Sequence, residues 1–429
     1  MKDFARSDDT AVQAQLDRLA ALSVPHGRLG LETIRALLAR IDDPHLALPP
    51  VFHVAGTNGK GSTCAFLRAM LEAQGYTVHA TTSPHLVRYN ERIRIAGELI
   101  SDEALAALLA EVLDLGDGLN PSFFEVTIAA AFLAFARTPA NACVVEVGLG
   151  GRFDATNVIE KPAVCGIATL GIDHERFLLA PEDGTPAEPI SRIAFEKAGI
   201  AKPGVPLVTL GPSMRAAATL MEVAEARGAP LLMEGVDWLT HVGTDGFHFI
   251  DAETRLALPF PTMPGRHQVI NAGLAVAMLH YQNHLAVSPE AMAEGIRAAN
   301  WPARLQRLSP GPLVGTREVW LDGGHNPDAG QMLGKQFAGH RAHLIIGMIE
   351  AKDPTAITGP LSRSIASISA VPVPGHDFHP AEAFGTEARA MPDVPTALAA
   401  LPDDGLPVLI AGSLYLAGEV LRLNNEVPD

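Results

Sequence analysis

The stretch from Val51 to Thr63, VFHVAGTNGKGST, decides the fold. Its first five residues are apolar and β-branched enough to form a buried strand. Three glycines then let the backbone take positive φ and approach a ligand closely. Lys60 adds a point charge, and Ser62 and Thr63 add hydroxyls at the start of a helix expected over residues 63–74. This order predicts a phosphate cradle, because backbone N–H groups and the helix N-terminus face the anion. A glycine-rich turn without a ligand is the alternative interpretation.

The loop is a shortened P-loop, because it departs from the pattern G-x-x-x-x-G-K-[ST] at two places. Val54 stands five positions before Gly59, where the pattern has glycine, and Gly61 separates Lys60 from Ser62. Lys60 would supply a point charge for the phosphates. The residues expected to line the nucleotide phosphates are Gly56, Thr57, Asn58, Gly59, Lys60, Gly61 and Ser62.

The composition indicates the class of protein. A length of 429 residues predicts two or three domains, and 48% hydrophobic with only 5% aromatic residues is typical of an α/β enzyme. No apolar run is long enough to span a membrane, and the N-terminal MKDFARSDDT lacks the apolar core of a signal peptide. Three cysteines without a C-x-x-C pair indicate a reducing compartment. We therefore expect a cytoplasmic protein without a membrane partner.

The charge of the chain narrows the choice of partners. A net charge of −16 argues against a nucleic-acid partner. The overall field also repels anions, so local Lys and Arg side chains must attract an anionic substrate. We expect small-molecule substrates.

Strands alternate with helices along most of the chain, which predicts a doubly wound, mainly parallel sheet. Short alternating runs from Leu231 to Pro261 predict a small antiparallel sheet, and ERFLLAPEDGTPAEPIS, from Glu175, is expected to be a surface excursion. The expected fold class is α/β with two domains. Residues 1–298 would form an ATP-binding P-loop domain, and residues 299–429 a smaller Rossmann-like α/β domain.

Three polar residues of the first domain fall at or near strand ends, where ligands bind in open α/β sheets: Ser83, Glu146 and His174. His174 ends the buried strand expected over VCGIATLGIDH, from Val164. A carboxylate inside the apolar run CVVEVG is costly unless a cation compensates it. Mg²⁺ shared with nucleotide phosphates fits such a set, and the histidine leaves Mn²⁺ as an alternative. Pairing of Glu146 with an Arg or Lys, and a turn cap for Ser83, are the structural alternatives.

A second group of candidates lies in the second domain, where Asp322, His325 and Asn326 follow a strand. The functional interpretation puts Asp322 on a ribose or base and His325 near the phosphates. A turn favoured by Gly and Asn-Pro is the alternative. Arg304, just past the domain joint, would reach a nucleotide or be a surface arginine.

These motifs resemble the folylpolyglutamate synthase/dihydrofolate synthase family, within the Mur ligase superfamily, over nearly the whole chain. The resemblance is carried by HVAGTNGKGS, TTSPHLVRYNERIRI, SFFEVT, VVEVGLGGRFDATN, GIDH, AFEKAGI and LDGGHNP. It implies an ATP-dependent ligase that adds L-glutamate to dihydropteroate, to folates, or to both. The carboxylate would be activated as an acyl phosphate, which the glutamate amine then attacks.

The resemblance also implies roles for individual residues. ATP would contact Asn271, Arg304 and Asp322 as well as the P-loop, and Ser83, Glu146 and His174 would hold the metal. Lys60, Lys197, His174 and His325 would be catalytic, with Lys197 carbamylated. The pterin or folate site would be lined by Gly27, Arg28, Leu29, Ser122, Phe123, Phe124, Glu125, Phe153, Asp154 and Ala155.

Lys197 has structural alternatives, since the ammonium could pair with Glu196 or with an acid elsewhere, or cap the helix C-terminus near Gly199, where cations are favoured. The whole chain has alternatives too. A cell-wall Mur ligase would need a uridine-nucleotide domain, yet the P-loop begins only about fifty residues into the chain. A P-loop regulatory NTPase would need no amine acceptor. The family resemblance implies a monomer.

Overall fold

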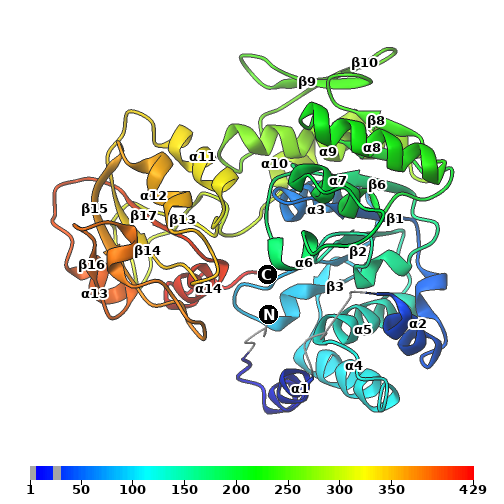
Figure 1. Ribbon diagram of the computed structural model, residues 1–429, viewed down its shortest axis with the longest axis horizontal. Coiled ribbons are helices and arrows are strands. Elements are labelled where there is room, and N and C mark those ends of the chain that lie inside the picture. The colour runs from blue at the N-terminus through cyan, green and yellow to red at the C-terminus, as the bar shows by residue number, and fades with distance from the viewer. Residues whose placement is uncertain (1–5, 23–29) are drawn as a thin grey trace. The chain divides into compact units, whose positions relative to one another are not determined.

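The computed structural model describes residues 6–22 and 30–429, which form two compact units (Figure 1). The first unit contains the described residues up to Ser83, then Tyr89–Thr262 and Arg266–Asn300. The second unit contains Trp301–Asp429 together with two short pieces, Pro84–Arg88 and Met263–Gly265. Leu86 and Val87 accordingly pack against a core cluster of the second unit. The boundary at 298/299, and the roles of the two domains, remain predictions.

An eight-stranded sheet forms the centre of the first unit, with the strand order β4-β3-β2-β5-β1-β6-β7-β8. The six strands from β2 to β8 in that order are parallel, and β3 and β4 are antiparallel at one edge. The strands are β1 (Val51–Ala55), β2 (Val78–Thr81), β3 (Ile93–Ile95), β4 (Glu98–Leu99), β5 (Ala142–Glu146), β6 (Val164–Ile167), β7 (Leu207–Thr209) and β8 (Leu231–Met233).

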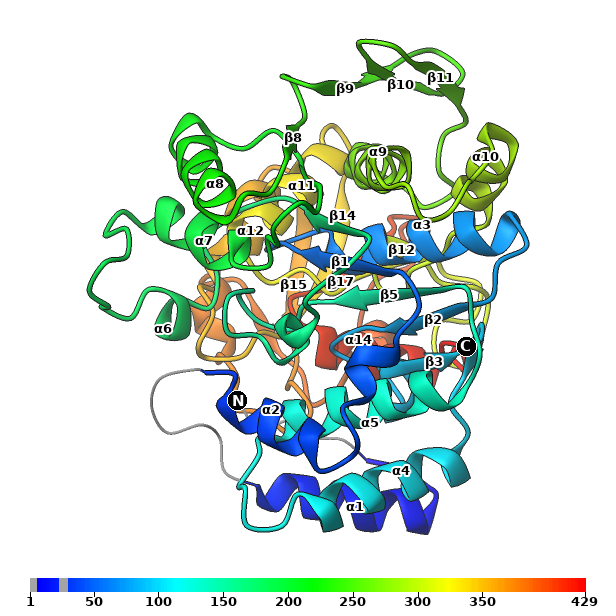
Figure 2. The ribbon, with the colours of Figure 1, turned by 90° about the vertical axis from the view of Figure 1, so that its right-hand side faces the viewer.

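Helices cover both faces of this sheet (Figure 2). One face, with Val51, Cys143 and Val145, packs against α1 (Thr10–Ala21), α2 (Glu32–Ala39), α4 (Asp102–Leu115) and α5 (Phe123–Arg137). The same face continues under α7 (Pro189–Ala198) and α8 (Met214–Arg227), with α6 (Glu175–Leu178) before them. The other face carries α3 (Lys60–Ala73) and α9 (Arg266–Tyr281), and α10 (Pro289–Ala298) packs on α3. Three 3₁₀ turns are Pro44–Ala47, Tyr89–Arg92 and Ala155–Val158.

A separate three-stranded antiparallel sheet, β11-β10-β9, consists of β9 (Trp238–Val242), β10 (Phe247–Asp251) and β11 (Arg255–Leu258). The predicted antiparallel segment began at Leu231, and that start was wrong. Residues 231–233 form β8, which pairs in parallel with β7 and extends the large sheet. The predicted start of the P-loop helix was also late, since α3 begins at Lys60.

The second unit has its own six-stranded sheet, in the order β12-β13-β17-β14-β15-β16. It is parallel except at β12, and α11 and α12 cover one face while α13 and α14 cover the other. The elements are β12 (Gln306–Arg307), β13 (Val319–Asp322), α11 (Pro327–Gln336), β14 (Ala342–Ile346), α12 (Thr355–Leu361), β15 (Ile365–Ala370), a 3₁₀ turn (Ala381–Phe384), β16 (Arg389–Ala390), α13 (Val394–Ala399), β17 (Val408–Ala411) and α14 (Leu414–Leu423). The predicted α/β fold class, with a mainly parallel sheet in each unit and a small antiparallel sheet, is confirmed.

Gly295 is where α10 comes closest to the P-loop helix. A Cβ at this position would lie 2.4 Å from both the Cα and the backbone N of Met70, so the backbones are in direct contact. Gly295→Ala should therefore lower the free energy of unfolding by about 1–3 kcal/mol, the usual cost of overpacking. Thermal melts followed by circular dichroism would measure this loss.

The matched control is Glu294→Ala, one residue earlier on α10, where the side chain is exposed. That change should leave the free energy of unfolding within about 0.5 kcal/mol of the wild type, because surface substitutions usually have small effects. Equal effects of the two substitutions would contradict the close packing of α10 on α3.

Candidate active site

The P-loop turn follows β1 and is closed by contacts that only glycine permits. Gly59 has a φ of 87° and comes directly before the first residue of α3. A Cβ on Gly59 would lie 2.4 Å from the Oδ1 atom of Asn271, and one on Gly56 would lie 2.9 Å from the Cβ of Ala168. Asn271, predicted to contact ATP, therefore lies against the P-loop.

The loop that follows β6 holds the P-loop in place. The backbone N–H groups of Thr57 and Asn58 donate to the carbonyl oxygen of Thr169 at 2.8 and 3.3 Å. The Thr57 hydroxyl donates to the carbonyl oxygen of Gly171 at 2.8 Å and accepts from its N–H at 3.1 Å. The predicted strand up to His174 was too long, because β6 ends at Ile167 and the following residues make these contacts. Sequence reasoning had not assigned Thr169 or Gly171 a role.

Two lysines converge on one oxygen atom of the P-loop. The Nζ atoms of Lys60 and Lys197 donate to the carbonyl oxygen of Gly56 at 3.1 and 2.9 Å. Lys60 is at the start of α3 and Lys197 is in the last turn of α7, so two distant segments deliver these side chains. The site therefore concentrates positive charge within a chain whose net charge is −16.

Lys197 is only 4% exposed, and burial lowers the pKa of its ammonium to about 7. The positive charge of Lys60 acts in the same direction. Glu196 does not neutralise Lys197 through an ion pair, since its carboxylate pairs with Arg152 at 2.8 Å and Arg192 at 3.0 Å. The proposed pairing of Lys197 with Glu196 is therefore not what the structure shows.

Of the three predicted metal ligands, the described contacts bring two together. The backbone N–H of Ser83 donates to Oε2 of Glu146 at 3.1 Å. Glu146 is the last residue of β5 and is 4% exposed, on the sheet face that carries α3. Burial raises the pKa of Cys64 on α3, and the negative charge of Glu146 raises it further. The Glu146 carboxylate therefore lies close to the P-loop helix.

His174 lies on a different segment, immediately before α6, with a φ of 53°. No group of three or more His, Cys, Asp or Glu side chains that could hold a metal ion occurs among residues 6–22 and 30–429. One carboxylate, one hydroxyl and one imidazole nevertheless fit Mg²⁺ or Mn²⁺, since such ions take their remaining ligands from water and phosphate oxygens.

The predicted substrate residues on α5 also cap that helix. The Ser122 hydroxyl accepts from the N–H of Glu125 at 3.3 Å, and the Glu125 carboxylate accepts from the N–H of Ser122 at 2.7 Å. Phe123 and Phe124 pack edge to face, and the ring of Phe124 covers Gly148 in the glycine loop after β5. The predicted residues Gly27, Arg28 and Leu29 lie outside the described residues.

Asp154 is buried and fixes the glycine loop. Its carboxylate accepts from the N–H of Leu149 at 2.8 Å, and from the N–H and hydroxyl of Thr156 at 3.0 and 2.6 Å. Burial raises its pKa. The neighbouring Phe153 ring stacks under the Arg152 guanidinium at 4.1 Å, and Ala155 is buried.

The candidates of the second unit surround the end of β13. Asp322 is 1% exposed and accepts from the backbone N–H groups of Leu305 and Gly324 at 2.8 and 2.7 Å. Burial raises its pKa, while the Arg304 charge opposes that rise and so acts on this carboxyl. The ring of His325 contacts the carbonyl oxygen of Gly323 at 3.1 Å.

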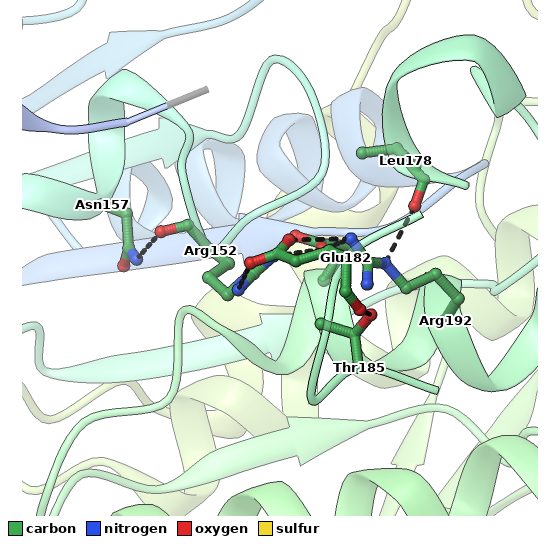
Figure 3. Close-up of polar contacts among 7 residues, drawn as sticks. Arg152, Asn157, Leu178, Glu182, Thr185 and Arg192 are labelled. Atoms are coloured by element: carbon green, nitrogen blue, oxygen red, sulfur yellow. Dashed lines mark hydrogen bonds and ion pairs between the residues drawn. The ribbon is translucent and has the colours of Figure 1, made fainter. Parts of the chain in front are cut away.

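A buried ionic cluster of the first unit was not predicted from the sequence. It consists of Arg152, Glu182, Arg192 and Glu196, which we call the four-charge cluster. Figure 3 shows Arg152, Glu182 and Arg192. Glu182 belongs to the segment expected to be a surface excursion, yet its side chain is only 15% exposed. In the sequence, Arg152 and Glu196 within largely apolar motifs could have indicated buried ion pairs. No local pattern indicated that Glu182 is buried.

Comparisons with known proteins agree with this geometry. The chain is 36% identical over 352 residues to the dihydrofolate synthase/folylpolyglutamate synthase of Bacillus subtilis, covering 76% of this chain and 78% of the relative. A solved structure, E. coli FolC in complex with DHPP and ADP, superposes with a TM-score of 0.85 at 30% identity, covering 96% of this chain and 97% of that one. No protein-family model matches the chain.

A third comparison is the bifunctional enzyme from Yersinia pestis complexed with AMPPNP and Mn, with a TM-score of 0.84 and 30% identity, covering 97% and 99% of the two chains. The chain belongs to the folylpolyglutamate synthase/dihydrofolate synthase family. The prediction of an ATP-dependent, amide-forming ligase of folate metabolism is thereby confirmed. In the described part of the chain, no helix has the length and apolar character needed to cross a bilayer.

The buried position of Lys197 predicts how stability of this ligase changes with pH. Its pKa is about 7 in the folded chain, against 10.5 for a free lysine. Between these values the unfolded chain holds more protons, so the free energy of unfolding rises with pH by up to about 1.4 kcal/mol per pH unit. Lys197→Met should remove that contribution.

Urea unfolding of wild type and Lys197→Met from pH 7.5 to 9.5, in buffer free of CO₂, measures the two slopes. The variant should show the smaller rise. Equal slopes would mean that Lys197 is not a buried amine with a depressed pKa.

Proposed function

We propose that the first unit binds the ATP phosphates on the loop from Gly56 to Ser62. Lys60 is the cation at the phosphates, and a divalent ion is held by Ser83, Glu146 and His174. The observation that carries this proposal is the convergence of Lys60 and Lys197 on the Gly56 carbonyl oxygen. The Lys60 cation at a turn before a helix N-terminus favours an anion there, and Lys197 is held at the same turn.

The reaction that this site supports is ligation of L-glutamate to dihydropteroate, to a folate, or to both. An oxygen of the acceptor carboxylate attacks the γ-phosphorus of ATP, ADP leaves, and an acyl phosphate forms. The glutamate amine then attacks the acyl carbon, phosphate leaves, and the amide forms with loss of a proton. The divalent ion, Mg²⁺ or Mn²⁺, would neutralise phosphate charge. AMPPNP, Mn and L-glutamate occur together in one related structure.

The remaining nucleotide contacts would come from Asn271, Arg304 and Asp322, with His325 near the phosphates. Asn271 is held in place, since its Nδ2 donates to Oε1 of Gln268 at 3.1 Å. Asp322 is held by two backbone N–H groups. Side chains fixed in this way lose little further freedom when they bind a ligand.

The acceptor acid would lie against Ser122 to Glu125 and Phe153 to Ala155, with Gly27 to Leu29 completing its site. Support comes from Phe124, whose ring covers Gly148 and so brings α5 against the glycine loop that carries Phe153. Two aromatic rings and a buried loop suit a flat pterin ring.

Lys197 would act as a carbamate. Its neutral amine adds to CO₂ and loses a proton, which leaves an N-linked carboxylate in place of an ammonium. Burial and the Lys60 charge both favour the neutral amine that this reaction needs. The negative charge of the carbamate would then offset Lys60 and orient the phosphates and the ion.

We also propose that the ligase works in the cytoplasm as a monomer. Cys64, Cys143 and Cys165 are all buried and unbridged, as expected for a reducing compartment.

Glu146→Gln tests the metal site, because it keeps the side chain's shape and removes the charge that balances the ion. The Mg²⁺ concentration for half-maximal activity should rise about tenfold or more, while the KM for the folate acceptor changes little. Glutamate-dependent ADP release at varied Mg²⁺ measures both quantities. Wild-type activity of the variant at low Mg²⁺ would make Glu146 a structural acid.

Lys197→Ala tests the carbamate. The variant should lose activity and recover part of it when short carboxylic acids are added, since these replace the missing carboxylate. Lys202→Ala is the matched control, because Lys202 follows α7 and donates to the Asn157 carbonyl oxygen instead. Full activity of Lys197→Ala without additive would refute the role.

A further inference from the structure

The four-charge cluster ties together three segments of the first unit. The Arg152 guanidinium comes from the glycine loop and contacts Glu182 at 2.5 Å and Glu196 at 2.8 Å. Arg192 on α7 lies 3.0 Å from each of the same two carboxylates. All four side chains are at most 15% exposed, so two positive and two negative charges cancel in a largely buried place. Glu182 is the only member from the segment between α6 and α7.

That segment is held at a second point one turn into α6. The Leu178 carbonyl oxygen accepts from Nε of Arg192 at 3.0 Å, and the Leu178 side chain packs on Gly150. The Thr185 hydroxyl donates to the Glu182 carbonyl oxygen at 2.6 Å and closes the turn after Glu182 (Figure 3). Arg192 therefore holds the segment at two points, the Leu178 carbonyl oxygen and the Glu182 carboxylate.

His174 begins this segment in a conformation that costs energy. Its φ of 53° is left-handed, which is unfavourable by roughly 1–2 kcal/mol for a residue other than glycine. The His174 carbonyl oxygen accepts from the N–H groups of Phe177 and Leu178 at 2.9 and 3.0 Å. The single turn of α6 is therefore bonded directly to His174, and whatever holds Leu178 and the following residues also holds His174.

A helix of one turn cannot hold itself in place, because helix nucleation is unfavourable in isolation. The contacts that fix α6 must come from outside it, and they include the bond of Leu178 to Arg192 and, just past its end, the ion pairs of Glu182. Loss of the Glu182 charge would leave two buried guanidinium groups facing one carboxylate, which strongly disfavours the observed arrangement.

We propose that Glu182 is a positioning residue for the ligase reaction: by anchoring the segment after α6 to Arg152 and Arg192, it keeps His174 in the left-handed conformation used for metal binding. This inference rests on the proposed role of His174 as a ligand. The segment between α6 and α7 would then hold His174 in position for the metal, in addition to joining the two helices.

Direct metal binding tests the inference without relying on turnover. Mn²⁺ binding to the full chain in the presence of AMPPNP is measured by electron paramagnetic resonance for wild type and variants. Glu182→Gln should raise the Mn²⁺ dissociation constant about tenfold, within the range typical of residues that orient metal ligands. Glu182→Asp keeps the charge and should recover part of the affinity.

The matched control is Asp183→Asn, which removes one negative charge at the next residue, where the side chain is exposed. It should bind Mn²⁺ as the wild type does. Thr185→Val removes only the hydroxyl that holds the Glu182 turn and should weaken binding less than Glu182→Gln. If circular dichroism shows that Glu182→Gln does not fold, Thr185→Val takes its place in the test.

His174→Ala separates the two ideas. If it binds Mn²⁺ as tightly as the wild type, the proposed metal site is wrong and the inference falls with it. If it binds weakly while folded Glu182→Gln, or Thr185→Val in its place, matches the wild type, the metal site stands and the positioning role of Glu182 is refuted. Equal weakening by Glu182→Gln and Asp183→Asn would also refute it, since a general charge effect would then explain both.

Discussion

The carbonyl oxygen of Gly56 is the point on which the first unit's site depends. It accepts from Lys60 and Lys197 together, in a P-loop turn that hydrogen bonds to Thr169 and Gly171 hold in place. Two ammonium groups around one acceptor repel each other, and burial adds to the cost for Lys197. The chain can relieve this repulsion by binding an anion or by leaving Lys197 neutral, and the proposed mechanism uses both.

The same electrostatic reasoning explains how an acidic chain handles acidic substrates. The net charge of −16 repels ATP, glutamate and a pteroate or folate acid at long range. Within the first unit, however, the ammonium of Lys60 lies at the phosphate loop, whereas Arg152 and Arg192 are paired with Glu182 and Glu196. The two arginines are therefore structural, and Lys60 remains as a cation for ligands.

The sequence predicted the parts of this site whose signals are local. The glycines and Lys60 fall within one short motif, and Glu146 stands out as a carboxylate in an apolar strand, so both could be proposed from the sequence, and their binding roles remain predictions. Ser122 was predicted only as a substrate residue, although Ser-x-x-Glu is also a capping box, which the structure shows. The P-loop helix was expected from residue 63, whereas α3 begins at Lys60, because residues 60–62 of the phosphate loop already belong to the helix.

What could not be predicted depends on residues far apart in the chain. The partner of Lys197 is the Gly56 carbonyl, 141 positions away, and the nearby Glu196 was the natural but wrong candidate. Glu182 lies in a Pro-rich, polar segment whose composition indicates exposure. Its burial follows only from the two arginines that the fold places beside it.

The central claim is that burial beside Lys60 makes Lys197 a neutral amine that becomes a carbamate. The most direct measurement is ¹³C NMR of the enzyme equilibrated with ¹³C-bicarbonate. The account predicts a carbamate resonance with a stoichiometry of one per chain that is absent from Lys197→Ala and retained in Lys202→Ala. No such resonance in the wild type at saturating bicarbonate, or one that persists in Lys197→Ala, would contradict it.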